Sequence, residues 1–244
     1  MKFNIAAFTH IGTVRSVNQD RILVNDKLLQ DGTHRLDDQP FCYCFVADGI
    51  GGSSHGEIAS QFVLEKIYDL KQKMLVSDTD EIHQILLAIN FDLLGFSGTD
   101  VSIKGTGTTL TGLMIDEMGE NLAIHAGDSE LWAFKNHLLF KLTDDQVFDD
   151  SEPGSPLISY FGGFENHLNL NVNSSMIRKI NDRDIFIVCS DGFFNSLTPK
   201  NVREVLLDRH SLYDKSNILL DKALTRGSND NISCILIEVS DLPS

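Results

Sequence analysis

The order of apolar segments predicts an α+β fold, in which runs of strands and runs of helices form separate layers. Seven short segments have the composition of strands, two batches of helical periodicity accompany them, and short turns join consecutive strands as in antiparallel hairpins. The strands are expected at roughly 3–9, 42–47, 108–115, 122–125, 131–134, 185–189 and 232–239.

The helical segments have recognisable start and stop signals. In the first batch, apolar residues recur at helical spacing over 58–70 and 80–94, and in the second batch a helix is expected over 212–226. Asp78 and Glu81 have the spacing of a capping box. Thr198 is an N-cap residue followed by Pro199, which suits the first helical position, and Gly227 ends the last helix.

Length and composition predict one domain. The chain has 244 residues, of which 42% are hydrophobic and 23% charged, and no segment rich in Pro, Ser or Gly interrupts it, so we expect a single domain over 1–244. The net charge of −15 argues against a nucleic-acid partner, because binding a polyanion depends on Lys and Arg. A negative charge favours a cationic ligand. The alternative interpretation is that the acidic surface only keeps the protein soluble.

The cysteines and the N-terminal residues predict the compartment. Cys42, Cys44, Cys189 and Cys234 lie in apolar segments without CxxC spacing, which indicates buried thiols rather than zinc ligands. The N-terminal residues make a poor signal peptide, and no apolar run is long enough to span a membrane. We therefore expect a cytoplasmic monomer that has no contact with membranes.

Five aspartates stand at the ends of expected strands: Asp20 in RSVNQD, Asp48 in VADGIGG, Asp128 in AGDSE, Asp191 in VCSDGF and Asp230 in DNIS. A single Asp-Gly pair usually marks only a turn. If these strands are neighbours, however, the carboxylates converge, and two of them ~4 Å apart repel by about 4 kcal/mol at an effective dielectric of 20. Such a cluster needs cations, and ligands that are all oxygen favour Mg²⁺ or Mn²⁺ over Zn²⁺.

Eight motifs in order, RSVNQD, VADGIGG, GEIAS, GTGTT, AGDSE, LTDDQ, SDGF and DNIS, resemble the signature of protein phosphatase 2C, the PPM family of metal-dependent serine/threonine phosphatases, in a compact bacterial-like form. They span residues 15–233. The resemblance implies a four-layer α-β-β-α sandwich, with two antiparallel sheets flanked by helices, and a phosphoserine or phosphothreonine protein as substrate. This agrees with the batches of strands and helices.

The resemblance also implies a metal centre of two ions, Mn²⁺ or Mg²⁺. Its members would be a bridging acid, the carbonyl of the next residue and three further acids: Asp48, Gly49, Asp20, Asp191 and Asp230. Two cations that share a bridging water lower its pKa towards 7, and the hydroxide then attacks phosphorus in line.

The same resemblance implies roles in the site for further residues. Arg15 matches the phosphate-binding arginine and would clamp phosphate oxygens bidentately, although a surface ion pair is the alternative for this residue. Asn231 is expected to hydrogen-bond the bridging water, whereas Thr108 and Thr109 are assigned to a core strand and left out of the site. Because Ile50 stands where some relatives carry a His, metal-bound water is expected to protonate the leaving group.

The chain also departs from the family pattern. Glu130 stands where the family usually has Arg, and Asn195 stands where it usually has Asp. The optional third metal of the family uses positions matching Asp128 and Asp191, so we expect it to bind weakly here. Residues 147–156 replace a longer flap and should form turns that leave access to the site open, unless they are only an acidic connecting loop.

Two other functions are compatible with the fold. One is a catalytically weak or inactive phosphatase-like module for binding or signalling, which the intact acids Asp48, Asp191 and Asp230 disfavour. The other is a different two-metal hydrolase, such as a phosphodiesterase, which the order of the motifs disfavours.

Overall fold

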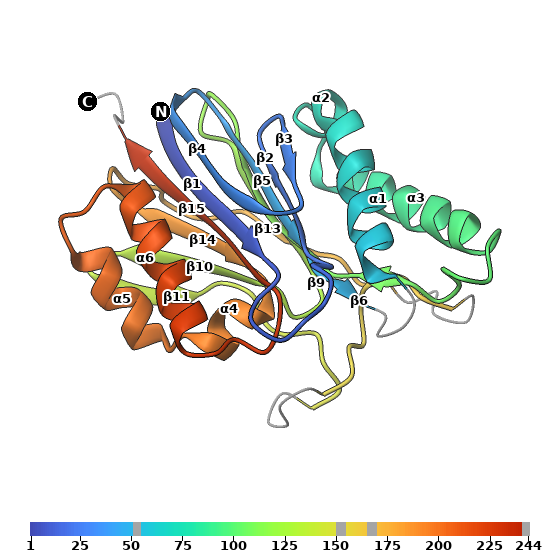
Figure 1. The fold of residues 1–244 in the computed structure, drawn as a ribbon. Helices are drawn as coiled ribbons and strands as arrows, with labels where there is room; N and C mark the ends of the chain where they lie inside the picture. The colour runs from blue at the N-terminus through green and yellow to red at the C-terminus, as the bar shows by residue number, and fades with distance from the viewer. Residues whose placement is uncertain (51–54, 150–154, 165–169, 241–244) are drawn as a thin grey trace.

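Two six-stranded antiparallel sheets pack between two sets of helices in a computed structural model, which describes residues 1–50, 55–149, 155–164 and 170–240 (Figure 1). The first sheet has the order β11-β10-β14-β15-β1-β4, and the second has the order β13-β9-β8-β5-β2-β3. Helices α1 to α3 cover the second sheet and α4 to α6 cover the first, as Figure 1 shows. The predicted four-layer α-β-β-α sandwich is confirmed.

The strands of the first sheet are β1 (Lys2–His10), β4 (Gly32–Gln39), β10 (Glu130–Lys135), β11 (Leu138–Lys141), β14 (Ile185–Cys189) and β15 (Ile232–Ser240). Those of the second sheet are β2 (Arg21–Val24), β3 (Lys27–Leu29), β5 (Cys42–Ala47), β8 (Leu110–Ile115), β9 (Asn121–Ala126) and β13 (Asn173–Ser175). The helices are α1 (Gly56–Asp69), α2 (Lys71–Met74), α3 (Thr79–Ser97), α4 (Asp191–Ser196), α5 (Pro199–Leu207) and α6 (Leu212–Thr225).

The central strand β5 consists of buried, mostly apolar residues because both of its faces are covered. In β5, Tyr43 and Phe45 point into the core between the second sheet and helices α1 to α3. The alternate residues Cys44 and Val46 point into the core between the two sheets. Since successive side chains of a strand point to opposite faces, a strand inside the sandwich has to supply apolar residues to two cores at once.

The predicted helices and the start signals of α3 and α5 are confirmed, although α1 begins two residues earlier than expected, at Gly56, and α3 continues to Ser97 rather than ending at 94. Asp78 and Glu81 form a capping box at the start of α3, and Thr198 caps α5 with Pro199 in its first turn. The expected helix over 212–226 is α6. The four cysteines are buried and unpaired, as predicted. Among the described helices, none has the length and apolar character that crossing a membrane requires.

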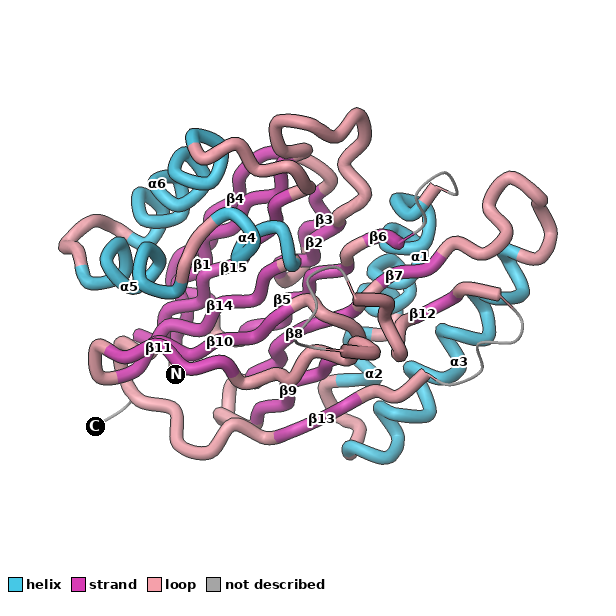
Figure 2. The backbone as a smooth tube through the Cα atoms, turned by 90° about the horizontal axis from the view of Figure 1, so that it is seen from below, coloured by secondary structure: helices cyan, strands magenta, loops and turns pink. Residues whose placement is uncertain are grey.

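The expected strand over 108–115 is divided into two. Its first part, β7 (Gly107–Thr108), pairs with β6 (Gly49–Ile50) and β12 (Phe161–Gly162) in a small third sheet beside α1 (Figure 2). Its second part is β8 of the large sheet. The break falls at Thr109, whose N–H donates to the carbonyl of Asp48 at 2.9 Å, so the chain leaves the large sheet where the candidate site begins.

Candidate metal centre

The five aspartates lie at element ends and influence one another. Asp20 precedes β2, Asp48 lies between β5 and β6, and Asp128 lies between β9 and β10. Asp191 is the first residue of α4, and Asp230 precedes β15. Burial raises the pKa of Asp48 well above its usual range, and the charges of the other four raise it further. The structure therefore brings the five predicted acids into one electrostatic neighbourhood.

Asp20 is completely buried, and only one of its two carboxylate oxygens has a partner. Its Oδ2 accepts hydrogen bonds from the hydroxyls of Ser190 and Ser233, at 2.8 and 2.7 Å. Its Oδ1 is buried with no hydrogen-bond partner in the described structure. Burial raises the pKa of Asp20 to about 7, with smaller contributions from the charges of Asp191 and Asp230 and an opposing effect of the two serines.

Two threonines, Thr108 and Thr109, hydrogen-bond to the backbone of Asp48. Its N–H donates to Thr109 Oγ1 at 3.0 Å, and its carbonyl oxygen accepts from Thr108 Oγ1 at 2.8 Å. Both threonines are buried, and Thr108 lies in strand β7, but they also act as positioning residues for Asp48, a role that the sequence did not predict. The GTGTT motif that contains them was the available signal.

Gly49 and Gly56 allow β6 to lie directly against the start of α1. A Cβ on Gly49 would stand 2.4 Å from the backbone carbon and oxygen of Gly56, closer than real Cβ contacts. Any side chain at either position would push α1 and the Asp48 loop apart. The remaining glycines of VADGIGG, Gly51 and Gly52, lie outside the described residues.

Asp191 and Asp128 form the other side of the cluster. Burial, followed by the charge of Asp230, raises the pKa of Asp191, against hydrogen bonds with Asp48 and with Asn195, whose Nδ2 donates at 3.0 Å. Burial raises the pKa of Asp128 to about 7, and Asp191 is the largest charge that adds to it.

Arg15 pairs with Asp230, a candidate metal ligand. Its Nη2 lies 2.7 Å from Asp230 Oδ2, and its side chain is 48% exposed. The surface ion pair considered as the alternative for Arg15 is therefore present. An exposed ion pair is worth about 0–1 kcal/mol, so this contact does not hold the guanidinium firmly.

The contacts of Asn231 use both protons of its amide and one of the two acceptor positions of its oxygen, so its hydrogen bond to a water in the site stays a prediction. Its Oδ1 accepts from the backbone N–H of Gln19 at 2.8 Å. Its Nδ2 donates to the carbonyls of Ile11 and Val17, at 2.9 and 3.0 Å. Because both ends of the amide contact one loop, Asn231 positions the segment that carries Arg15.

Glu130, the residue that departs from the family pattern, is neutralised by Lys141. Lys141 Nζ lies 2.6 Å from Glu130 Oε1 and 2.7 Å from Asp145 Oδ1. The sequence reading missed Lys141, and no motif pointed to it. In the segment over 147–156, residues 150–154 lie outside the described residues, and Val147 bridges to Leu157 on either side of them.

The donor set fits hard cations by chemistry, since it consists of carboxylates and a backbone carbonyl. The orphaned oxygen of Asp20 and the raised pKa values of its neighbours also fit a site that takes positive charge. Within the described ranges, however, no three His, Cys, Asp or Glu side chains are arranged to hold one ion together. One oxygen of Asp191 accepts from Asn195 and one oxygen of Asp230 pairs with Arg15, so an ion would compete with these two partners.

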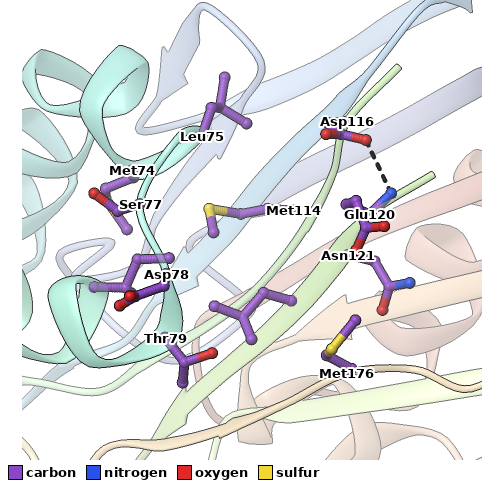
Figure 3. Close-up of a pocket in the computed structure, with 12 residues that line it drawn as sticks. Met74, Leu75, Ser77, Asp78, Thr79, Met114, Asp116, Glu120, Asn121 and Met176 are labelled. Atoms are coloured by element: carbon purple, nitrogen blue, oxygen red, sulfur yellow. Dashed lines mark hydrogen bonds between the residues drawn. The ribbon is translucent and has the colours of Figure 1, made fainter. Parts of the chain in front are cut away.

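An apolar hollow at the opposite end of β8 is not the candidate site. Met74, Met114 and Met176 line it, and Figure 3 shows Asp116 bonded to the backbone of Glu120 on its rim. Asp116 closes a turn, and none of the five clustered aspartates lines this hollow.

A family model described as protein phosphatase 2C matches residues 16–226 of the chain. The chain belongs to the protein phosphatase 2C family. The resemblance read from the eight motifs is thereby confirmed, together with the enzyme class of the family, the metal-dependent protein serine/threonine phosphatases.

Relatives and solved structures agree with this family. The serine/threonine phosphatase stp of Listeria monocytogenes serotype 4b is 25% identical over 83% of this chain and 85% of its own length. A crystal structure of Mycobacterium tuberculosis PstP/Ppp has a TM-score of 0.80 at 22% identity and covers 99% of this chain and 100% of that one. The catalytic domain of PstP in complex with two manganese ions has a TM-score of 0.75 at 23% identity, covering 98% and 99%.

Proposed function

We propose that this chain, as a single catalytic domain, hydrolyses phosphoserine and phosphothreonine in proteins with two divalent cations held around Asp48. The observation that carries the proposal is the buried Asp20 Oδ1, which has no donor within a set of aspartates that raise one another's pKa. A buried carboxylate oxygen that lacks a donor disfavours the ionised form of Asp20, and cations would supply the missing compensation.

Asp48 is the proposed bridging ligand, helped by the carbonyl of Gly49. Asp20, Asp191 and Asp230 would complete the ligand set, with Asp128 as a further candidate ligand. Two cations bound there would supply Lewis acidity and would lower the pKa of a water between them, which would make it a nucleophile at neutral pH. The threonine contacts to the Asp48 peptide support this assignment, because they fix the backbone from which its carboxylate projects.

Arg15 is the proposed ligand for the phosphate of the substrate. Its guanidinium is half exposed and weakly held by Asp230, so a phosphate dianion can compete for it. The planar fork of arginine can donate two parallel hydrogen bonds to phosphate oxygens. Asn231 contributes indirectly, by holding the backbone at Val17 and Gln19 in the same loop.

The all-oxygen ligand set supports Mn²⁺ or Mg²⁺, and a structure of PstP contains two manganese ions. The partner proposed is a phosphorylated protein, and the proposed compartment is the cytoplasm. The compartment rests on four buried cysteines that form no disulfide, since reducing compartments keep thiols free.

Steady-state assays with Mn²⁺ test the proposal on three substrates: a phosphothreonine peptide, p-nitrophenyl phosphate and its bis-ester. We expect hydrolysis of the peptide and the monoester, and a loss of about 100-fold or more in kcat in Asp48→Asn and Asp191→Asn. Asp221→Asn, which removes an exposed acid from α6, is the matched control and should retain full activity.

The outcomes separate the alternatives. Absence of turnover on every substrate favours a phosphatase-like binding module, and preference for the bis-ester favours a phosphodiesterase. Full activity in both aspartate variants would remove the metal-centred mechanism.

A further inference from the structure

The ammonium of Lys141 lies at the junction of two strands and the loop beside Asp128. Lys141 is the last residue of β11, and Glu130 is the first residue of the neighbouring strand β10. Lys141 Nζ donates to Glu130 Oε1 at 2.6 Å and to Asp145 Oδ1 and Oδ2 at 2.7 and 2.8 Å. An ammonium has three protons, and these three contacts use all of them.

Glu130 is fully engaged by this arrangement. Its second oxygen, Oε2, accepts a hydrogen bond from the indole Nε1 of Trp132 at 2.6 Å. The side chains of Glu130 and Lys141 are only 13% and 27% exposed, so solvent screens their interaction less than on an open surface. The indole of Trp132 packs against Phe194 of α4, with ring centroids 4.6 Å apart, so the cluster also contacts the helix that begins with Asp191.

The cluster acts electrostatically on Asp128. Apart from burial and Asp191, the charges of Asp145 and Glu130 act on the Asp128 carboxyl. Lys141 contacts both acids, so its one positive charge offsets part of their combined negative charge. Without its ammonium, the charges of Glu130 and Asp145 would act on Asp128 with no nearby cation to oppose them, a charge distribution that attracts a cation.

We propose that Lys141 is a tethered counter-ion that takes the place of a further metal ion beside Asp128, so that this chain holds two cations tightly and excludes an additional one. The proposal rests on the two-metal centre proposed above. It makes Lys141 a positioning residue that sets the metal stoichiometry of the site, and it does not require contact between Lys141 and the substrate.

Equilibrium dialysis with Mn²⁺ measures the stoichiometry directly in the wild type and three variants. Lys141→Met removes the charge and keeps most of the side-chain length, whereas Lys141→Arg keeps the charge. The double variant Glu130→Gln/Lys141→Met removes one acid and one base, so it has the net charge of the wild type but lacks the ion pair.

We expect two tightly bound Mn²⁺ in the wild type and in Lys141→Arg. Lys141→Met should bind one additional Mn²⁺ at least about tenfold more tightly than any further ion binds to the wild type. The double variant should lose most of this gain, because its local charge is restored. If Lys141 were only a structural link, the double variant would behave like Lys141→Met, and this result would overturn the proposal.

The two proposals fail in different ways. If the wild type binds two ions and Lys141→Met also binds only two, the counter-ion role of Lys141 is wrong and the metal centre stands. If the wild type binds no Mn²⁺, the metal centre is wrong and the role of Lys141 falls with it.

Trp132 gives a second measurement on the unaltered chain, because it is the single tryptophan. Filling the two main sites with Mg²⁺ should leave its emission unchanged, since Glu130 keeps both of its partners. In Lys141→Met, Mg²⁺ should shift the emission as Glu130 turns towards the new ion. A shift in the wild type that saturates with the two main sites would overturn the proposal even if Lys141→Met does not fold.

Discussion

Asp20 should make the metal-free protein less stable as the pH rises. Its folded pKa is raised from 3.8 to about 7, so the folded state binds a proton that the unfolded state has released. The resulting stabilisation is complete below pH 4 and is lost as the pH rises through 7. Each pKa unit is worth about 1.36 kcal/mol, so the rise corresponds to about 4 kcal/mol of unfolding free energy.

The test is the thermal unfolding of wild type and Asp20→Asn in EDTA at pH 5 and pH 8. The neutral amide cannot ionise, so the variant should match the wild type within a few degrees at pH 5. At pH 8 it should melt higher by on the order of 10 °C, since 1 kcal/mol shifts Tm by roughly 2–4 °C in a domain of this size. Saturating Mn²⁺ should reverse the order, because only the wild type has the full ligand set.

The Asp221→Asn variant, which lacks an exposed acid, is again the control, and its Tm should equal that of the wild type at both pH values. A variant that is destabilised equally at pH 5 and pH 8 would refute the reasoning, because Asp20 would then act through packing rather than through its buried charge.

Three further substitutions test individual contacts. Thr109→Ala removes the acceptor for the Asp48 N–H and should raise the Mn²⁺ concentration for half-maximal activity about tenfold. Thr109→Ser keeps the hydroxyl and should leave this concentration unchanged. Equal effects of the two substitutions would show that the hydroxyl does not position Asp48. Gly56→Ala places a Cβ 2.5 Å from the backbone of Gly49 and should cost about 1–3 kcal/mol in thermal unfolding, a result contradicted by an unchanged Tm. Arg15→Lys should raise KM for a phosphothreonine peptide about tenfold without altering the Mn²⁺ affinity measured by dialysis. An unchanged KM would show that Arg15 does not bind the phosphate.

The large elements of the fold were predictable because burial leaves a pattern along the chain. The strand Cys42–Ala47 was predicted with its observed ends, since its six residues are all buried. By contrast, β4 has the sequence GTHRLDDQ and none of its residues is buried, so its composition does not predict a strand. Its register is set by pairing with β1, where Ala6 lies opposite Arg35. Such a strand forms because a neighbour offers backbone hydrogen bonds, and the sequence does not record that.

The motifs indicated which residues gather at the site, but not what each of them contacts. Asn231 was predicted to be at the site, yet its amide holds Val17, 214 residues earlier in the chain. Thr109 contacts Asp48 across 61 residues, and Lys141 contacts Glu130 across a strand pair. These partners come together through the pairing of strands and the packing of the loops between them, which periodicity alone does not determine. The acids were visible because their type and position before or after strands is a local signal.

A crystal structure of the Mn²⁺-soaked protein, with anomalous data collected at the manganese edge, tests the central claim most directly. The two-metal centre predicts two anomalous peaks roughly 3.5–4 Å apart, with the carboxylate of Asp48 between them and Asp191 and Asp230 turned towards the ions. Manganese peaks elsewhere on the acidic surface, with none within reach of Asp48, would contradict it.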